Sequence, residues 1–494
     1  MTDDTAQSSS NVSRRNYLQA GAAGLAAVAF SSSATAKEGK AKGKGNGNGR
    51  GNRNSVLIKG GTVVTVDEDY GVQRDTDVYV ENGEIRHIGD DLQVPAADVI
   101  DASDSIVVPG FVNAHLHTWE AGVRGIAGDW TFMEYLEKML GNISSHYRPE
   151  DAYLGNLFGA VMQLNAGTTT VLDWFHIANT PEHSDRAIDG LEDAGIRALF
   201  THGPPGDDSA KWWSNSSTTH PDDIKRLARE RFPSADGRLT LAMGARGPDY
   251  STDEVTRKDI ELARELDIPV SMHIGSLGGG GVKKLEELGL LGDDLNYVHG
   301  NRLTKEEFEL IGQSGGSVST TPEVELQMGM GMPALGDALE AGAVPSVGVD
   351  IVSNVSDDIF TQLRMALQVE RGLRNQPEVD AGKQIQNVTP TAHRALELAT
   401  IEGARALGLE DQIGSLTPGK RADITIIDAD DLNTAPVHKP VETVVFQAGI
   451  ENIDTVLVDG NVVKRNGLMH NPTAKNNLDR LTQSGRRIIR KSGL

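Results

Sequence analysis

Val108-Pro109-Gly110-Phe111-Val112-Asn113-Ala114-His115-Leu116-His117 is the stretch that decides the fold. An apolar run leads into a Pro-Gly break, and two histidines then follow two residues apart. In an extended segment, residues i and i+2 lie on one face, so both imidazoles can point at one ion. The pair alone does not establish a metal site, because such short motifs also arise by chance. Its meaning depends on the rest of the chain.

The composition limits the chemistry that the chain can use. Its 494 residues suffice for about three average domains, or for one α/β barrel with an accessory domain. The sequence holds no cysteine, which excludes disulfides, thiolate metal ligands and cysteine nucleophiles. Any metal ion must therefore be held by histidine, aspartate and glutamate side chains.

The net charge of -23 argues against two classes of partner. Basic residues gather in 37–54, so the chain after residue 54 is more acidic than this total suggests. An acidic surface repels nucleic acid and anionic membranes, and we expect neither partner. High salt screens the repulsion between like charges, so the pattern predicts a halophilic protein. An ordinary acidic soluble protein is the alternative.

The N-terminus resembles a twin-arginine export signal. Ser13-Arg14-Arg15-Asn16-Tyr17-Leu18 precedes a short apolar stretch and then Ala34-Thr35-Ala36, an A-x-A cleavage pattern. The apolar stretch is far shorter than the ~20 residues that span a bilayer, so we expect no membrane insertion. We interpret 1–36 as a signal read by the twin-arginine translocation machinery, which would export the protein to the cell envelope or the medium; a disordered tail is the alternative. Residues 37–54 read as a flexible low-complexity linker.

The two ends of the remaining chain share a β pattern. Short apolar runs separated by turn residues occur in 55–108 and again in 413–470, including Val441-Glu442-Thr443-Val444-Val445-Phe446. We expect both segments to build one composite β-sandwich domain. Residues 471–494 are basic and predict a helix on the surface.

The middle of the chain, 109–412, alternates buried strands with amphipathic helices. This repetition predicts a (β/α)8 TIM-like barrel, and the fold class is α/β. We expect a barrel helix after most strands, for example over 149–165 and 305–313. The eight expected strands are 107–117, 168–174, 196–202, 239–245, 268–274, 295–299, 316–321 and 344–350.

Polar residues stand at the carboxyl ends of several of these strands. The first ends in His115 and His117, the fifth in His273, the sixth in His299 and the eighth in Asp350. In such barrels the carboxyl ends of the strands carry the active site. Zinc and ferrous iron favour a set of nitrogen and oxygen ligands with one position open for water. The sequence therefore predicts one divalent metal ion, zinc or iron(II).

These motifs together resemble the amidohydrolase superfamily, in its branch of heterocycle deaminases and s-triazine hydrolases related to cytosine deaminase. The resemblance covers residues 55–465. It rests on 108–117, on Gly167-Thr168-Thr169-Thr170-Val171, and on Met272-His273, Val298-His299 and Gly348-Val349-Asp350. Gly414-Ser415-Leu416-Thr417-Pro418-Gly419-Lys420-Arg421-Ala422-Asp423 adds a motif of the accessory domain.

The resemblance implies roles for five residues. His115, His117, His273 and Asp350 would bind the metal, which lowers the pKa of a bound water from 15.7 towards ~7. Asp350 would act as the base and later pass the proton to the leaving nitrogen. His299 would donate a hydrogen bond to the developing oxyanion or ring nitrogen.

Three departures from the family pattern bear on the chemistry. Binuclear relatives carry a carbamylated lysine at the end of strand four, whereas 241–247 contains no lysine, so one metal ion is expected. Ser276 replaces a proton-shuttling glutamate three residues after the strand-five histidine. Glu323 and Glu325 share a face if their segment is extended, and one of them could replace that carboxylate, or either could bind an N–H or cationic group. Solvated loop glutamates are the alternative reading.

The expected substrate is a small nitrogenous, heterocyclic compound hydrolysed at a C–N bond. We expect Trp119, His176, Glu323 and Glu325 to contact it, with Trp119 stacking on a flat ring. Packing on the barrel rim is the alternative for Trp119. An amidase, a hydrolase of another ring substituent, and a catalytically silent solute-binding protein are alternative functions. We also expect a homo-oligomer.

Overall fold

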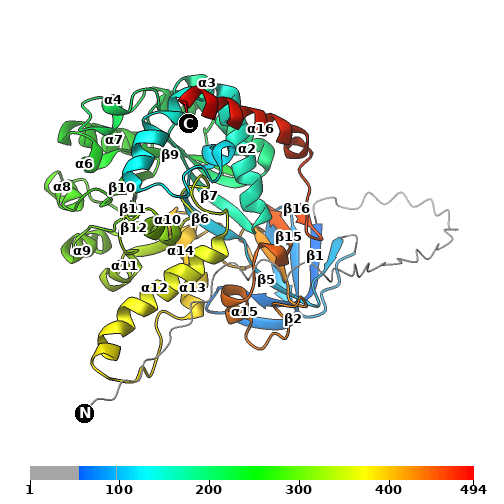
Figure 1. Cartoon of the computed structure of the whole chain (residues 1–494). Helices are drawn as coiled ribbons and strands as arrows, with labels where there is room; N and C mark the ends of the chain where they lie inside the picture. The colour runs from blue at the N-terminus through cyan, green and yellow to red at the C-terminus, as the bar shows by residue number, and fades with distance from the viewer. Residues whose placement is uncertain (1–54, 96) are drawn as a thin grey trace, which may run out of the picture. The chain divides into compact units, whose positions relative to one another are not determined.

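The computed structural model describes residues 55–95 and 97–494. The predicted signal peptide and linker lie outside the described residues. Within them, the middle of the chain forms an α/β barrel, and its two ends meet in a separate mixed sheet (Figure 1).

The separate sheet has nine strands and is built from both ends of the described chain. At its centre β5 pairs antiparallel with β14, with Val107 opposite Ile426, and β5 also pairs in parallel with β1. Ile58 and Leu457 are among the apolar side chains buried against it. The strands are β1 (Ser55–Val64), β2 (Val72–Glu81), β3 (Glu84–Gly89), β4 (Asp98–Asp101), β5 (Ser105–Pro109), β14 (Ile424–Asp428), β15 (Ile453–Val458), β16 (Asn461–Arg465) and β17 (Leu468–Met469).

The barrel consists of eight parallel strands in sequential order, as expected. Helices cover these strands on the outside, so the strands are buried on both faces and read as continuous apolar runs. All eight residues of β7 are buried. The strands are β6 (Phe111–Leu116), β7 (Thr168–Phe175), β8 (Arg197–His202), β9 (Leu239–Ala245), β10 (Val270–Ile274), β11 (Leu295–His299), β12 (Ser317–Thr320) and β13 (Val344–Val347).

Helices connect and surround the barrel strands. Local signals set several helix starts; Thr304, for example, caps the first turn of α9 reciprocally with Glu307. The helices are α1 (Phe132–Tyr135), α2 (Pro149–Asn165), α3 (Pro181–Ala194), α4 (Ser209–Trp213), α5 (Asp223–Glu230), α6 (Gly247–Tyr250), α7 (Asp253–Glu265), α8 (Gly281–Glu287), α9 (Lys305–Ser314), α10 (Pro322–Gln327), α11 (Leu335–Ala341), α12 (Ile359–Asp380), α13 (Ala392–Leu398), α14 (Ile401–Ala406), α15 (Pro440–Phe446) and α16 (Pro472–Ser492), with the short turns η2 (Thr118–Val123), η3 (Leu136–Leu140), η4 (Ile143–His146) and η5 (Ile450–Asn452).

One expected strand is a helix. Val441–Phe446 was predicted as β because it is rich in β-branched residues, but it forms α15. Pro440 stands in the first turn, where its missing N–H costs nothing, and the helix packs on α12 and α13. Tertiary packing therefore overrides the local β propensity.

A buried arginine joins the barrel to the separate sheet. Arg197, at the start of β8, donates two hydrogen bonds to the Asp423 carboxylate, at 2.8 and 3.2 Å, and also contacts Asp459. The side chains of Arg197 and Asp423 are each only 2% exposed. A buried guanidinium with a bidentate partner fixes the relative position of the two parts.

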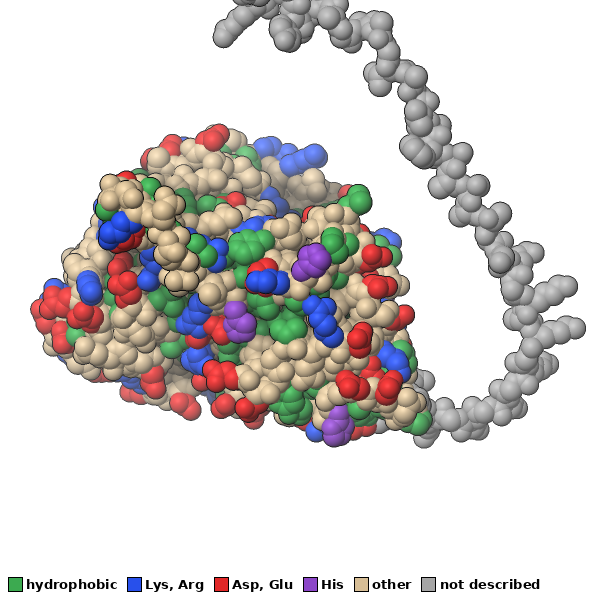
Figure 2. All heavy atoms as spheres, turned by 90° about the horizontal axis from the view of Figure 1, so that it is seen from below, with side chains coloured by type: hydrophobic (Ala, Val, Ile, Leu, Met, Phe, Trp, Pro, Cys, Tyr) green, Lys and Arg blue, Asp and Glu red, His purple; other side chains and the backbone are tan. Residues whose placement is uncertain are grey.

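The basic C-terminal segment forms the expected helix, α16, which packs on α2 and α3 (Figure 1). Arg487 of α16 pairs with Asp151, and Arg480 pairs with Glu150. None of the described helices is both long and apolar enough to cross a membrane. On the face seen in Figure 2, acidic side chains are scattered over the surface with lysine and arginine among them.

Candidate metal centre

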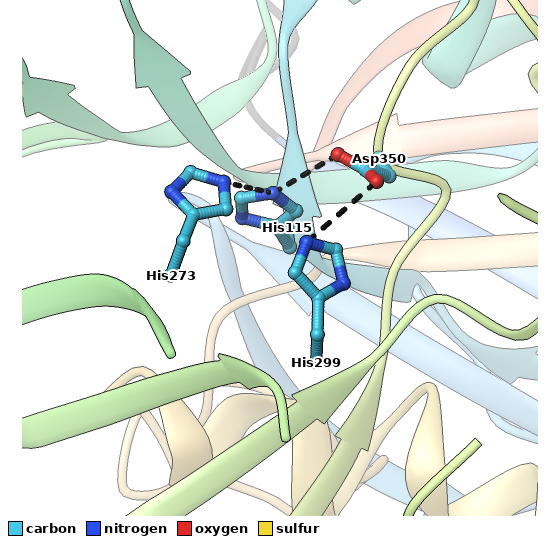
Figure 3. Close-up of side chains that lie close together, drawn as sticks. All are labelled: His115, His273, His299 and Asp350. Carbon is cyan, nitrogen blue, oxygen red and sulfur yellow. Dashed lines mark hydrogen bonds and ion pairs between the residues drawn. The ribbon is translucent and has the colours of Figure 1, made fainter. Parts of the chain in front are cut away.

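Four side chains from different strand ends converge at the mouth of the barrel (Figure 3). His115 Nε2 lies 3.1 Å from Asp350 Oδ1 and 3.2 Å from Nε2 of His273. His117 Nε2 lies 3.3 Å from the same Asp350 oxygen, and His299 Nε2 lies 3.9 Å from Asp350 Oδ2. The structure therefore brings together all five residues at the strand ends.

The barrel closes at these residues. The Asp350 N–H donates to the carbonyl of His115 at 2.9 Å, and the His117 N–H donates to the carbonyl of Asp350 at 2.8 Å. Gly348 permits this close approach, because a Cβ there would lie 2.6 Å from the His115 carbonyl oxygen. The closure fixes the backbone of three of the expected ligands.

Two site residues have an unusual backbone conformation. His299 and Asp350 have φ values of 75° and 70°, a left-handed region that non-glycine residues adopt rarely. Such strain, which costs on the order of 1–3 kcal/mol per residue, persists where the surroundings enforce it and is concentrated at functional sites. Here it turns both side chains towards the other ligands.

The geometry fits a divalent metal ion. In a tetrahedral zinc site with bonds of about 2.0–2.1 Å, the ligand atoms lie about 3.3–3.4 Å apart. Three spacings within the set His115, His117, His273 and Asp350, of 3.1, 3.2 and 3.3 Å, are close to this distance. His299 joins His115, His273 and Asp350 in a group whose ligand atoms all lie within 4.8 Å of one another. Without an ion, the facing imidazole nitrogens of His115 and His273 would have to share a single proton. His117, His176 and His273 form a second, overlapping group whose ligand atoms lie within 4.8 Å of one another.

The pKa shifts of His115, His273 and Asp350 suit metal binding, which needs neutral imidazoles and an ionised carboxylate, whereas the shift of His117 has the opposite direction. Burial lowers the pKa of His115 to about 4 and holds the pKa of His273 well below its usual value. For His117, burial lowers the pKa, but the Asp350 carboxylate outweighs it and the net shift is upward. Burial raises the pKa of Asp350, but its contacts with His115 and His117 outweigh burial and hold that pKa well below its usual range.

Groups behind the ligands orient them. His117 donates from Nδ1 to the carbonyl oxygen of Trp174 at 2.6 Å, which leaves Nε2 for the ion. Asp173 accepts hydrogen bonds from the N–H and hydroxyl of Thr118, at 3.1 and 2.7 Å, and from Asn156 at 2.6 Å. Asp173 thereby holds the turn that follows His117. Sequence reasoning missed Asp173, although it lies near the end of β7 on a buried strand.

The two glutamates after β12 have different surroundings. Their segment is the helix α10 and is not extended, because Pro322 starts a helical turn. Glu325 is fully buried; it accepts from the Thr321 N–H at 2.8 Å and lies 3.3 Å from His299 Nδ1. Glu323 instead accepts a hydrogen bond from Gln362 at 2.8 Å. Only Glu325 of this pair therefore reaches the five residues at the mouth.

A small cavity of about 30 Å³ lies beside these residues. His176 lines it, as expected of a substrate-contacting residue, whereas Trp119 does not. Trp119 is fully buried, and its ring lies 5.1 Å from that of Tyr147. This position corrects the expectation that Trp119 stacks on the substrate. Trp213 and Tyr250 line the cavity instead.

The other two departures from the family pattern concern the segment after β9, which contains Arg246, and Ser276. Arg246 follows β9 where binuclear relatives would carry a lysine; it is buried and bonds to Asp259 and Ser216, each at 2.8 Å. Ser276, two residues past β10, is also buried, and its hydroxyl has no hydrogen-bond partner among the described residues. Neither residue lines the cavity.

A buried carboxyl next to the ligands also escaped sequence reasoning. Glu120 accepts a hydrogen bond from the Tyr135 hydroxyl at 2.6 Å and another from Ser353. Burial raises the pKa of Glu120 to about 7. The sequence signal for Glu120 is its position three residues after the predicted ligand His117. The turn η2, and not a strand, sets the direction of the Glu120 side chain.

The chain is similar to curated enzymes over most of its length. It is 26% identical over 427 residues to the 5-methylthioadenosine/S-adenosylhomocysteine deaminase of Thermoanaerobacter pseudethanolicus, covering 83% of this chain and 94% of that protein. It is 28% identical over 423 residues to the 5'-deoxyadenosine deaminase of Methanosarcina mazei, covering 83% and 92%.

Solved structures share the fold. An adenosine deaminase from Xanthomonas campestris with bound zinc superposes with a TM-score of 0.76 and 26% identity, covering 88% of this chain and 98% of that one. A zinc complex of atrazine chlorohydrolase from Arthrobacter aurescens TC1 gives a TM-score of 0.75 at 22% identity, covering 87% and 100%. Residues 106–463 match the amidohydrolase family. The chain therefore belongs to the amidohydrolase family and is a metal-dependent hydrolase that acts on carbon–nitrogen bonds.

Proposed function

We propose that the protein binds one zinc ion through His115, His117, His273 and Asp350, and that it hydrolyses a C–N bond of a small nitrogen heterocycle. The convergence of three imidazole Nε2 atoms and one carboxylate, at spacings of 3.1–3.3 Å, carries this proposal. The bound zinc of the Xanthomonas structure and the deaminases among the curated relatives support it.

The residues at the mouth divide the work of hydrolysis. When bound, zinc supplies a Lewis acid and a water molecule of lowered pKa. Asp350, held ionised by its neighbours, accepts a proton from the attacking water and returns it to the leaving nitrogen. His299 presents Nε2 towards the reacting atoms and stabilises the charge that develops there.

Glu325 positions His299. Its carboxylate faces Nδ1 of the ring, so it fixes which imidazole nitrogen carries the proton. The contact also holds the ring so that its other nitrogen, Nε2, faces Asp350 at 3.9 Å. We infer that the Glu325–His299 pair replaces the proton route that Ser276 interrupts.

Hydrolysis of a ring substituent other than an amine, or of an amide, is the second candidate. The observation in its favour is Ser276, because no carboxylate stands where the deaminases of this branch carry their shuttle. Hydrolysis of such a substrate depends less on protonation of a ring nitrogen.

The test is a substrate screen on purified protein, monitored for ammonia and for the hydrolysed product. We expect turnover that is lost after chelation and restored by one equivalent of zinc. Release of ammonia from a ring amine identifies a deaminase, whereas release of ammonia from an amide, or turnover without ammonia, identifies the second candidate. Bound zinc without any turnover would instead favour a silent solute-binding protein.

The N-terminal sequence supports a proposal on location. We infer export through the twin-arginine pathway, on the Arg14-Arg15 pair and the A-x-A pattern. Substitution of both arginines by lysine should leave the protein in the cytoplasm of the expressing cell, and a secreted double variant would overturn the proposal.

The acidic composition and an exposed helix support two further proposals. We infer adaptation to high salt, and we expect the free energy of unfolding to rise between dilute buffer and molar KCl; equal stability would contradict this. We also infer a homo-oligomer, since Leu373 and Val379 on α12 are 44% and 52% exposed. Light scattering of the wild type and of the double variant Leu373→Glu/Val379→Glu tests the association; a monomeric wild type would contradict it.

A further inference from the structure

The wall of the active-site cavity is almost wholly apolar. Four histidines and one aspartate line it, namely His117, His176, His273, His299 and Asp350. Ten further residues line it, and each is aliphatic, aromatic or a methionine. They are Phe132, Tyr135, Leu136, Leu140, Trp213, Tyr250, Val324, Met328, Met330 and Ile351. No lysine, arginine, glutamate, asparagine, glutamine, serine or threonine is among the described lining residues.

The polar groups next to this wall bond elsewhere. The Tyr135 hydroxyl donates to Glu120 at 2.6 Å, so its proton is not available to a ligand. Glu323 bonds to Gln362, and Arg246 is held by Asp259 beneath the wall. Among the described lining residues outside the cluster of histidines and aspartate, the Tyr250 hydroxyl and the Trp213 indole N–H thus remain as hydrogen-bond donors.

The wall is nevertheless shaped for a flat ring. The rings of Trp213 and Tyr250 lie 5.3 Å apart and nearly perpendicular, at 85°, and Trp213 lies 5.3 Å from His176. Two aromatic faces at right angles provide one stacking and one edge contact for a planar ligand. Met328 and Met330 add flexible thioethers that adapt to substituents of different shape.

Resting on the proposed function, we propose that the substrate is an uncharged, planar nitrogen heterocycle that carries alkyl or aryl groups and lacks ribose-like hydroxyls. A buried hydroxyl without a hydrogen-bond partner weakens binding by roughly tenfold or more. A nucleoside would bring several hydroxyls against a wall that offers two side-chain donors, on Tyr250 and Trp213. The curated relatives are named for adenosine derivatives, so this chain differs from them in the part of the substrate that it accepts.

A matched series of adenines tests this proposal with the purine ring unchanged. The series is adenosine, 5'-deoxyadenosine, an adenine with an n-butyl group in place of the ribose, and the same butyl compound ending in an ammonium group. We expect kcat/KM, or the inhibition constant for compounds that are not turned over, to favour the butyl compound over adenosine by at least a hundredfold. The ammonium compound should lose most of that gain.

The result separates the substrate class from the reaction. Hydrolysis with adenosine equal to or better than the butyl compound would overturn the substrate class and leave the proposed function intact. Preferred binding of the butyl compound without hydrolysis of any compound in the wider screen would support the apolar wall and overturn the function.

Two variants on one loop test whether the wall sets this preference. Met330→Gln places an amide of similar size in the cavity, whereas Met332→Gln changes a side chain that is 57% exposed and outside the lining. We expect Met330→Gln to reduce the preference for the butyl compound about tenfold at unchanged zinc content, and Met332→Gln to leave it unaltered. An unchanged preference in Met330→Gln would overturn the proposal.

Discussion

Glu325 Oε1 lies 3.3 Å from Nδ1 of His299, while the opposite nitrogen of that ring faces Asp350. A fully buried carboxylate at this distance fixes both the orientation and the tautomer of the imidazole. The pair comes from the ends of two neighbouring strands, β11 and β12.

Glu325→Gln should lower kcat at least tenfold, because the amide no longer presents to Nδ1 the carboxylate that orients the His299 ring. KM and zinc content should change little, and the acidic limb of the pH–rate profile should shift, which a purely structural role would not produce. Glu323→Gln is the control, since Glu323 bonds to Gln362 away from the mouth. Equal kcat in both variants would sink the positioning role.

Asp350→Asn should abolish turnover and reduce bound zinc. The amide keeps the shape of the side chain but loses the charge that faces His115 and His117 and the ability to accept a proton. Kinetic assays and metal analysis of the purified variant give the two readouts. Normal turnover would remove Asp350 from the reaction.

Glu120 predicts a specific pH dependence of stability. Its pKa rises from 4.5 in the unfolded chain to about 7 in the fold, so the folded state binds the proton more tightly. The contribution of Glu120 to the stability is therefore largest below about pH 4.5 and falls by on the order of 3 kcal/mol as the pH rises to about 7.

Glu120→Gln should flatten this decline, which urea unfolding of the metal-free protein at a series of pH values measures. The exposed residue Glu309 supplies the control Glu309→Gln, which should leave the curve as in the wild type. A decline in Glu120→Gln as steep as that of the wild type would show that other groups cause it.

Arg197→Met should destabilise the fold by about 3–5 kcal/mol, because it leaves the buried carboxylate of Asp423 without its partner. Arg229→Met removes an exposed pair with Glu230 and should cost less than about 1 kcal/mol. Denaturant unfolding of both variants makes the comparison; similar losses would mean that Arg197 does not hold the two parts together.

The barrel was predictable because two signals in the sequence, the apolar runs and the polar residues that follow them, indicate the same strand positions. Buried parallel strands read as apolar runs, and the metal ligands stand at their carboxyl ends, so strand positions and ligand positions support each other. Val441–Phe446 broke the pattern, since packing on α12 and α13 decides its conformation.

The cavity wall was less predictable. Trp119 and Trp213 both follow barrel strands, yet Trp119 points into the core and Trp213 lines the cavity. The turn η2 sets the direction of Trp119, and the short helix α4 sets that of Trp213. The type of side chain does not determine either direction. Pro322 indicates the start of the helix that places Glu325 against His299. The raised pKa of Glu120 depends on burial, which no local sequence pattern reveals.

Anomalous diffraction at the zinc absorption edge, on crystals of the zinc-loaded protein, locates the ion directly. We expect one peak per chain, at about 2.0–2.2 Å from Nε2 of His115, His117 and His273 and from the Asp350 carboxylate. A peak elsewhere, a second peak of equal height, or no peak among these four residues would contradict a mononuclear metal centre at the mouth of the barrel.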